Sequence, residues 1–188
     1  MKKQGWFMAV AMIGLLAVAG VACAGKEEAG KTPAEQTMPV GKATAAIEAR
    51  SGSSLSGTAD FVEHGGKLMI TVSLKGAPPG LHAVHIHEKG DCSAPDASSA
   101  GPHFNPGGHQ HGAPDAPQHH AGDLGNITIG EDGTGTLMIH SEDLAVAGEP
   151  NGVVGRAIIV HEKPDDFVTQ PTGNAAGRIG CGVIISGT

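Results

Sequence analysis

Hydrophobic and polar residues alternate along most of the chain from residue 41 onward. In the segment 67–74 the large apolar side chains recur at every second position, and they are Leu68, Ile70, Val72 and Leu74. This spacing puts them on one face of an extended strand. The same pattern predicts eight strands, at 41–48, 54–62, 67–74, 81–87, 124–129, 134–140, 153–160 and 181–185. No part of this region has helical periodicity, so we expect an all-β fold, an eight-stranded antiparallel barrel or sandwich.

Two intervals, 88–123 and 161–180, interrupt this rhythm. Both are rich in Gly, Pro, Asp and His and carry little strand pattern. Loops of this length are uncommon in compact domains unless they have a function or are held by a crosslink. We therefore expect both loops to be functional.

The beginning of the chain predicts export. Lys2 and Lys3 precede an uncharged apolar run over 6–22, which is typical of a secretory signal peptide at 1–22. Residues 19–23 resemble a bacterial lipobox, in which cleavage leaves Cys23 lipid-modified, and a conventional cleavage motif at 22–24 that discards Cys23 is the alternative. Residues 23–40 predict a flexible tether to a folded domain at 41–188. We expect the protein in the periplasm or outer envelope, in contact with membrane only through the lipid.

Composition and charge narrow the function. The formal net charge of −7 disfavours nucleic acid as a partner, because phosphates bind basic surfaces. Eleven His among 188 residues is the most unusual count in the chain. Because His is the commonest metal ligand among side chains, a metal site is the first expectation.

The three cysteines suggest one crosslink. Cys92 opens the first long loop and Cys181 closes the second, so a disulfide between them would tie the loops together. Two unpaired buried thiols are the alternative. Cys23 would then have no partner, which agrees with its lipidation or removal.

One group of candidate metal ligands lies on predicted strands. His85 and His87 share one face of the strand 81–87, opposite Val84 and Ile86. If the apolar pair enters the core, the two imidazoles project beneath the long loops, where they suit copper or zinc. His161 ends a second apolar strand and strengthens this group.

A second group lies at the first long loop, and its members are His103, His111, His120 and Asp123. Three imidazoles and one carboxylate form a complete tetrahedral set for zinc. The alternative is a flexible His-rich segment that binds metals loosely, because His109 and His119 occur in the same segment.

Five separate motifs resemble the copper/zinc superoxide dismutase family, in chain order between about residues 54 and 185. They are Gly80–Glu88, Ala100–Pro106, His120–Asn126, Val160–Lys163 and Gly173–Arg178. The resemblance implies a Greek-key barrel with two long functional loops, and one copper and one zinc ion per chain. It also implies superoxide as substrate, disproportionated to dioxygen and hydrogen peroxide by alternating reduction and oxidation of copper.

The resemblance assigns a role to each candidate residue. The implied copper ligands are His85, His87, His103 and His161, and the implied zinc ligands are His103, His111, His120 and Asp123. His103 would bridge the two ions and take part in proton transfer, and Arg178 would dock the anion. Asp165 would join a copper His to a zinc His, and Cys92 and Cys181 would form the family's disulfide.

The chain departs from cytosolic members in two places. The loop 162–177 is shorter and has Phe167–Pro171 in place of acids and Lys, so Lys89, Lys163 and Lys75 become candidates for steering the anion. Cys92 directly follows Asp91, as in exported bacterial members, so the family's dimer contact does not carry over and a homodimer stays open. A non-catalytic periplasmic copper/zinc-binding protein is the alternative function.

Overall fold

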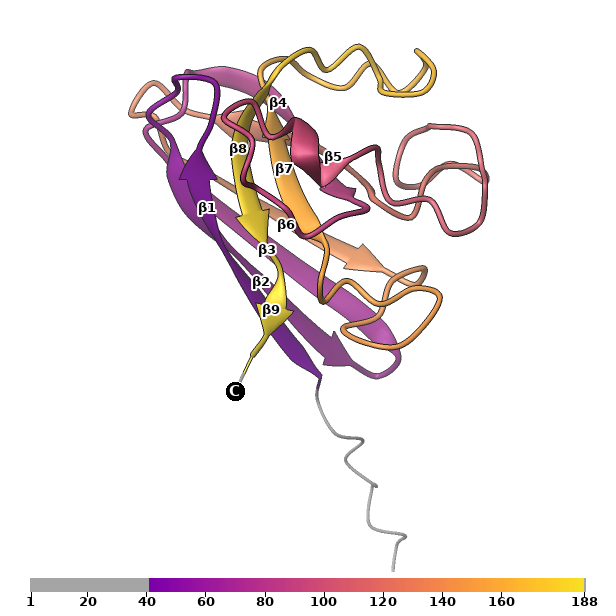
Figure 1. The fold of residues 1–188 in the computed structure, drawn as a ribbon. Helices are drawn as coiled ribbons and strands as arrows, with labels where there is room; N and C mark the ends of the chain where they lie inside the picture. Colours follow the sequence, from indigo (N-terminus) through magenta and orange to yellow (C-terminus); the bar gives the residue numbers. More distant parts are fainter. Residues whose placement is uncertain (1–40, 188) are drawn as a thin grey trace, which may run out of the picture. The chain divides into compact units, whose positions relative to one another are not determined.

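The alternating sequence folds as antiparallel strands within residues 41–187, the part of the chain that the computed structural model describes (Figure 1). The strands are β1 (Lys42–Ala49), β2 (Ser56–His64), β3 (Lys67–Lys75), β4 (Gly80–His87), β5 (Asp123–Ile129), β6 (Gly135–Ser141), β7 (Ala157–His161), β8 (Arg178–Val183) and β9 (Ile185–Ser186). A short 3-10 turn, η1 (Ser98–Ala100), lies in the first long loop. The expectations for residues 1–40, namely the signal peptide, the lipid on Cys23 and the tether, lie outside the described residues.

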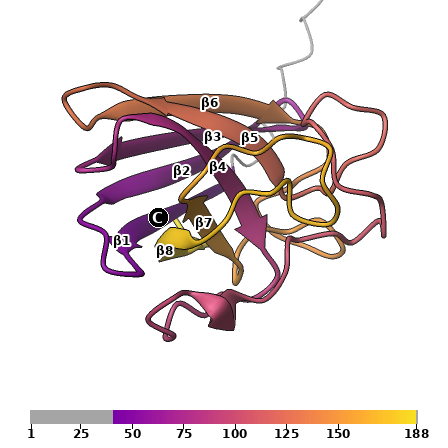
Figure 2. The same ribbon diagram turned by 90° about the horizontal axis from the view of Figure 1, so that it is seen from above.

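The strands close almost completely into a barrel in the hydrogen-bonded order β5-β4-β7-β8-β1-β2-β3-β6. Every neighbouring pair is antiparallel, and β3 pairs with β6 instead of with β4. Seen from above, β1, β2, β3 and β6 make one wall, and β4, β7 and β8 make the other (Figure 2). The predicted eight-stranded antiparallel Greek-key barrel is therefore confirmed, with β9 as a two-residue addition that pairs with β1.

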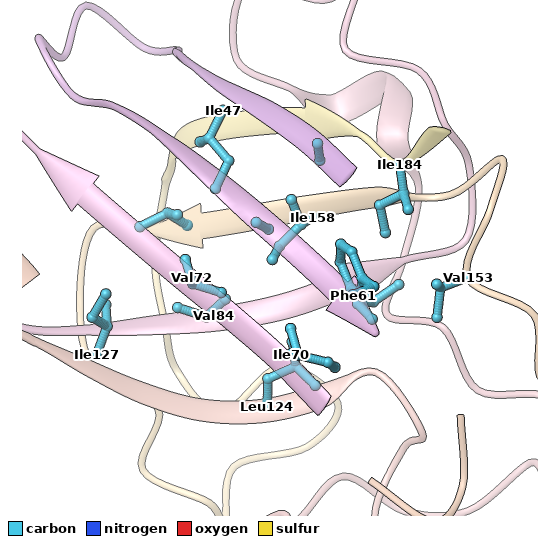
Figure 3. Packing of buried hydrophobic residues seen from close by; sticks show 14 of the residues in the cluster. Ile47, Phe61, Ile70, Val72, Val84, Leu124, Ile127, Val153, Ile158 and Ile184 are labelled. Carbon is cyan, nitrogen blue, oxygen red and sulfur yellow. The ribbon is translucent and has the colours of Figure 1, made fainter. Parts of the chain in front are cut away.

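The inward faces of the strands form one hydrophobic core. Phe61, Ile70, Val84 and Ile158 come from four different strands and are fully buried there (Figure 3). Burying a side chain of this size stabilises a fold by about 1.5–3 kcal/mol. Because Val84 and Ile86 face this core, the histidines between and after them face the opposite side of β4, as the alternation predicts.

Two strands begin three or more residues away from their predicted starts. The predicted strand 153–160 begins only at Ala157, because Gly155 has a left-handed backbone (φ +86°) within a turn. Val153 is apolar because, together with Leu144 and Val146, it joins the core from a loop. The last strand, predicted at 181–185, begins earlier, at Arg178, so that Arg178 pairs with His161 in the β7–β8 ladder.

The two long loops leave the barrel on the same side, at the right in Figure 1. Under the first loop, Ala157 and Ile159 on the outer face of β7 pack with Ala97, Ala100 and Cys181. The outer face of β7 is therefore buried, which explains why this strand is apolar on both faces. Among residues 41–187, no helix has the length and apolar character required to cross a membrane.

Candidate metal centre

Backbone hydrogen bonds bring His103, a residue of the first long loop, back to β4. His103 forms an isolated antiparallel bridge with His87. The Phe104 N–H donates to the Ile86 carbonyl at 2.8 Å, and the Glu88 N–H donates to the Pro102 carbonyl at 3.0 Å. His103 thus lies against the strand that carries His85 and His87, although 16 residues separate it from His87 along the chain.

Four buried imidazoles form the first cluster, and they belong to His85, His87, His103 and His161. Their nearest ring nitrogens all lie within 4.8 Å of one another. Each ring has a buried nitrogen without a hydrogen-bond partner, at Nδ1 of His85, at Nε2 of His87 and His103, and at both nitrogens of His161. Buried polar atoms are normally paired, so these convergent lone pairs fit a metal ion.

The second cluster shares one ring with the first. Its members are His103, His111, His120 and Asp123, all buried. The Asp123 carboxylate lies 2.9 Å from Nδ1 of His103, 3.0 Å from Nδ1 of His111 and 3.4 Å from Nδ1 of His120. Three imidazoles and a carboxylate suit tetrahedral zinc, and four imidazoles suit copper. His103 therefore offers Nε2 to one cluster and Nδ1 to the other.

For three of the rings, hydrogen bonds fix which nitrogen the ring presents to its cluster. Nε2–H of His85 donates to Asp165 at 2.7 Å, and Nε2–H of His111 donates to the other oxygen of Asp165 at 2.9 Å. Nδ1–H of His87 donates to the Gly101 carbonyl at 2.8 Å. Such contacts from outside the ligand set hold a ring in one tautomer and orientation. Asp165 joins the two clusters in this way.

Burial and nearby charges lower the pKa values of three of these rings and raise that of His111. Burial and the neighbouring His103 lower the pKa of His87, and burial also lowers the pKa of His161. Burial lowers the pKa of His103 to about 4 despite its bond to Asp123. For His111, burial is outweighed by Asp123 and Asp165, which raise its pKa to about 9. His87, His103 and His161 are therefore neutral at pH 7, the state in which imidazole binds metals.

Arg178 lies beside the first cluster. Its two terminal nitrogens donate to the Ala97 carbonyl at 2.7 Å and to the Gly101 carbonyl at 2.8 Å. Gly101 also accepts from His87, so one carbonyl fixes both the arginine and a candidate ligand. A half-buried guanidinium held in this way can bind an anion with its remaining N–H groups.

A family model described as copper/zinc superoxide dismutase (SODC) matches residues 55–184. The chain belongs to the copper/zinc superoxide dismutase family. Cu-Zn superoxide dismutase 2 of Brassica juncea is 44% identical over 152 residues, which cover 77% of this chain and 97% of that relative. A crystal structure of the clock protein EA4 superposes with a TM-score of 0.69 at 37% identity, covering 76% of this chain and 92% of that one.

The disulfide of this superoxide dismutase joins the first long loop to β8. Cys92 and Cys181 are bonded, with their Cα atoms 5.8 Å apart, so the alternative of two unpaired thiols is wrong. Arg50 adds a second tie, because its Nε donates to the Cys92 carbonyl at 3.0 Å. The loop that presents the Ala97 and Gly101 carbonyls to Arg178 is thereby anchored to the strand that begins with Arg178.

The surplus histidines take other positions. Nδ1 of His82 lies 2.9 Å from the His161 carbonyl, and its Nε2 lies 2.9 Å from the Pro78 carbonyl. This ring is therefore buried and hydrogen-bonded, as expected. His119 bonds to the Ala116 carbonyl and lies 3.4 Å from Asp143, so His120 and not His119 enters the second cluster. His109 is exposed.

Several supporting residues gave no signal in the sequence. The side chain of Asn126 forms two hydrogen bonds with the backbone of Asp165. Asn126 Nδ2 donates to the Asp165 carbonyl at 3.0 Å, and Asn126 Oδ1 accepts from the Asp165 N–H at 2.7 Å. The Arg156 guanidinium carbon lies 3.5 Å above the ring of Phe104, next to His103. Gln170 binds the backbone of His111. Only spatial contact identifies these residues, because none belongs to a ligand pattern.

Proposed function

We propose that this superoxide dismutase converts two superoxide anions and two protons into dioxygen and hydrogen peroxide at one copper–zinc centre. His85, His87, His103 and His161 would hold copper, and His103, His111, His120 and Asp123 would hold zinc. The single observation that supports this proposal most strongly is the position of His103, which belongs to both clusters. When bound, copper supplies one-electron exchange with superoxide, and zinc, which has no redox chemistry, supplies a fixed positive charge.

The residues of the chain perform the remaining steps. Arg178 binds the anion through charge-assisted hydrogen bonds, because two backbone carbonyls already fix its orientation. His103 holds a proton at Nε2 during one half of the cycle and donates it to the peroxide product in the other half. Asp165 keeps Nδ1 of His85 free by accepting from Nε2–H.

Reconstitution with one equivalent each of copper and zinc tests the proposal. The measurements are bound metal by mass spectrometry and superoxide decay by stopped flow. We expect decay proportional to bound copper, and we expect His103→Gln to lose most of it. His119→Gln is the matched control with unchanged activity, because His119 lies outside both clusters. Protein that binds both metals at full occupancy without accelerating decay would instead be a non-catalytic copper/zinc-binding protein.

We also propose that the protein is of the exported bacterial type, with a signal peptide at 1–22 and a lipid on Cys23 that anchors it in the periplasm or outer envelope. The apolar run, the lipobox-like segment and the Asp91-Cys92 sequence support this proposal. Mass spectrometry of the mature protein tests it, with a lipidated N-terminal Cys23 expected. A mature chain that begins after Cys23 would contradict it. Light scattering of the same sample tests the homodimer.

A further inference from the structure

The side chain of Gln170 forms hydrogen bonds with both the backbone N–H and the backbone carbonyl of His111, a residue of the first long loop. Its Oε1 accepts from the His111 N–H at 2.8 Å, and its Nε2 donates to the His111 carbonyl at 2.8 Å. A primary amide matches this pair of backbone groups because it carries one acceptor and one donor side by side. Gln170 thus binds His111 as a neighbouring strand would.

The turn that carries Gln170 is itself well defined by hydrogen bonds. The Asp166 carboxylate accepts from the backbone N–H groups of Val168 and Thr169 at 3.0 and 2.8 Å, and from the Thr169 hydroxyl at 2.6 Å. The Gly173 N–H donates to the Thr169 carbonyl at 2.7 Å. Gln170 therefore extends from a fixed turn, although it is an exposed residue.

Three further contacts converge on His111. Its Nε2–H donates to Asp165, its Nδ1 lies 3.0 Å from Asp123, and Gly173 packs against its ring so closely that an added Cβ would lie 2.7 Å from Nε2. Asp165, Gln170 and Gly173 all belong to the loop 162–177. This loop therefore contacts the ring of His111 with two residues and its backbone with a third.

The geometry points to Gln170 as a positioning residue for the second metal, an inference that rests on the proposed zinc assignment. By fixing the backbone of His111 it fixes the direction of Nδ1, so zinc retention depends on the loop that also leads to Arg178. We call the two hydrogen bonds between the Gln170 amide and the His111 backbone the amide clamp. In this chain it lies in the segment 167–171, where cytosolic members carry acids and Lys. The proposed copper ligands share only His103 with the proposed zinc ligands and do not include His111. Zinc is therefore the metal that the clamp affects first.

Two variants of the holoenzyme test the clamp. Gln170→Glu keeps the acceptor but places a carboxylate oxygen against the His111 carbonyl, and Gln170→Ala removes both bonds. Gln118→Glu is the matched control, because this exposed residue of the first loop undergoes the same charge change. Zinc release to a chromogenic chelator is the first readout, and the visible spectrum of Co²⁺ in the zinc site is the second. Substitutions that loosen such supporting contacts typically cost 10–100-fold in metal affinity.

We expect both Gln170 variants to release zinc about tenfold faster or more, with a shifted cobalt spectrum, and Gln118→Glu to behave as wild type. The copper EPR spectrum should keep its wild-type intensity, which shows that the fold persists. Wild-type release rates and spectra in both variants would overturn the inference, as would parallel loss of copper and zinc. Wild-type protein that binds no second metal would instead overturn the zinc assignment.

Discussion

His103 can belong to both clusters because imidazole has two nitrogen atoms on opposite sides of one small ring. Nδ1 lies 2.9 Å from Asp123, and Nε2 is buried among the first cluster without a partner. Burial lowers the pKa of His103 to about 4, so at pH 7 the neutral ring carries one proton and keeps a lone pair on its other nitrogen. No other side chain offers two such donor atoms.

Arg178 gives the first prediction at the scale of the residue. Arg178→Met keeps a long side chain but removes the charged N–H groups. Hydrogen bonds to charged groups contribute about 1.5–3 kcal/mol, so we expect kcat/KM for superoxide to fall about 10–100-fold. Copper and zinc contents, measured on the same sample, should stay at wild-type values. An unchanged kcat/KM would show that Arg178 does not bind the anion.

The sequence predicts the candidate ligands better than the residues that support them. The alternation of Val84, His85, Ile86 and His87 was sufficient to place two imidazoles opposite the core. Asn126 and Gln170 could not be predicted, because an amide that binds a distant backbone leaves no periodicity or spacing in the sequence. Gln170 and Asn126 each act across 39 or more positions of the chain.

At the scale of the element, β4 and β7 carry candidate ligands, and both strands are buried on their two faces where these histidines lie. β4 and β7 could be predicted because their apolar residues alternate or run continuously. The start of β7 could not, because Val153 is buried from a loop and looks like strand in the sequence. Pattern alone does not distinguish a buried loop residue from a buried strand residue.

The disulfide gives the second prediction. The double variant Cys92→Ser/Cys181→Ser opens a link between residues 89 positions apart, for which the chain-entropy estimate is about 4–5 kcal/mol of unfolding free energy. Urea unfolding of the metal-free protein measures this loss. We also expect lower kcat/KM, since the loop that holds Arg178 through Ala97 and Gly101 loses its anchor. Equal stability with and without the crosslink would contradict this account of the loop.

At the scale of the whole molecule, the net charge of −7 opposes the approach of an anion, so local positive charge must offset it. Lys89 is exposed, and an added Cβ at Gly101 would lie 3.7 Å from three of its carbons, so it lies beside the carbonyl that binds Arg178. Of Lys89, Lys163 and Lys75, we select Lys89 on this contact.

The third prediction concerns the positive charge of Lys89. Lys89→Glu should lower kcat/KM several-fold at low ionic strength and flatten its dependence on salt, because salt screens exposed charges. Lys42→Glu, at the start of β1, makes the same change in net charge and should have a smaller effect. Stopped-flow decay of superoxide across a salt series measures both. Identical salt profiles for the two variants would remove Lys89 as a steering residue.

The fourth prediction concerns the stability of the metal-free protein at different pH values. Asp123 and Asp165 raise the pKa of His111 from 6.5 to about 9, so its contribution is complete below pH 6.5 and is lost as pH rises through about 9. In acid, the lowered pKa values of His87 and His161 have the opposite effect, because the unfolded chain then binds more protons. Stability should therefore peak near neutral pH.

Zinc should abolish the alkaline part of this profile, because it replaces the proton at Nδ1 of His111. Urea unfolding at pH 6.5 and pH 9.5, with and without zinc, measures the difference. Metal-free protein that is equally stable at both pH values, or that loses as much stability with zinc bound, would contradict the assignment of His111.

The central claim is that a single ring, His103, connects the two metals. EPR spectroscopy of the protein with Cu²⁺ in the first cluster, compared before and after Co²⁺ fills the second, tests this connection most directly. Two paramagnetic ions joined by one imidazole couple their spins, so we expect the copper signal to disappear when cobalt binds and to persist when zinc binds instead. An undiminished copper signal with both Cu²⁺ and Co²⁺ fully bound would show that His103 does not join them.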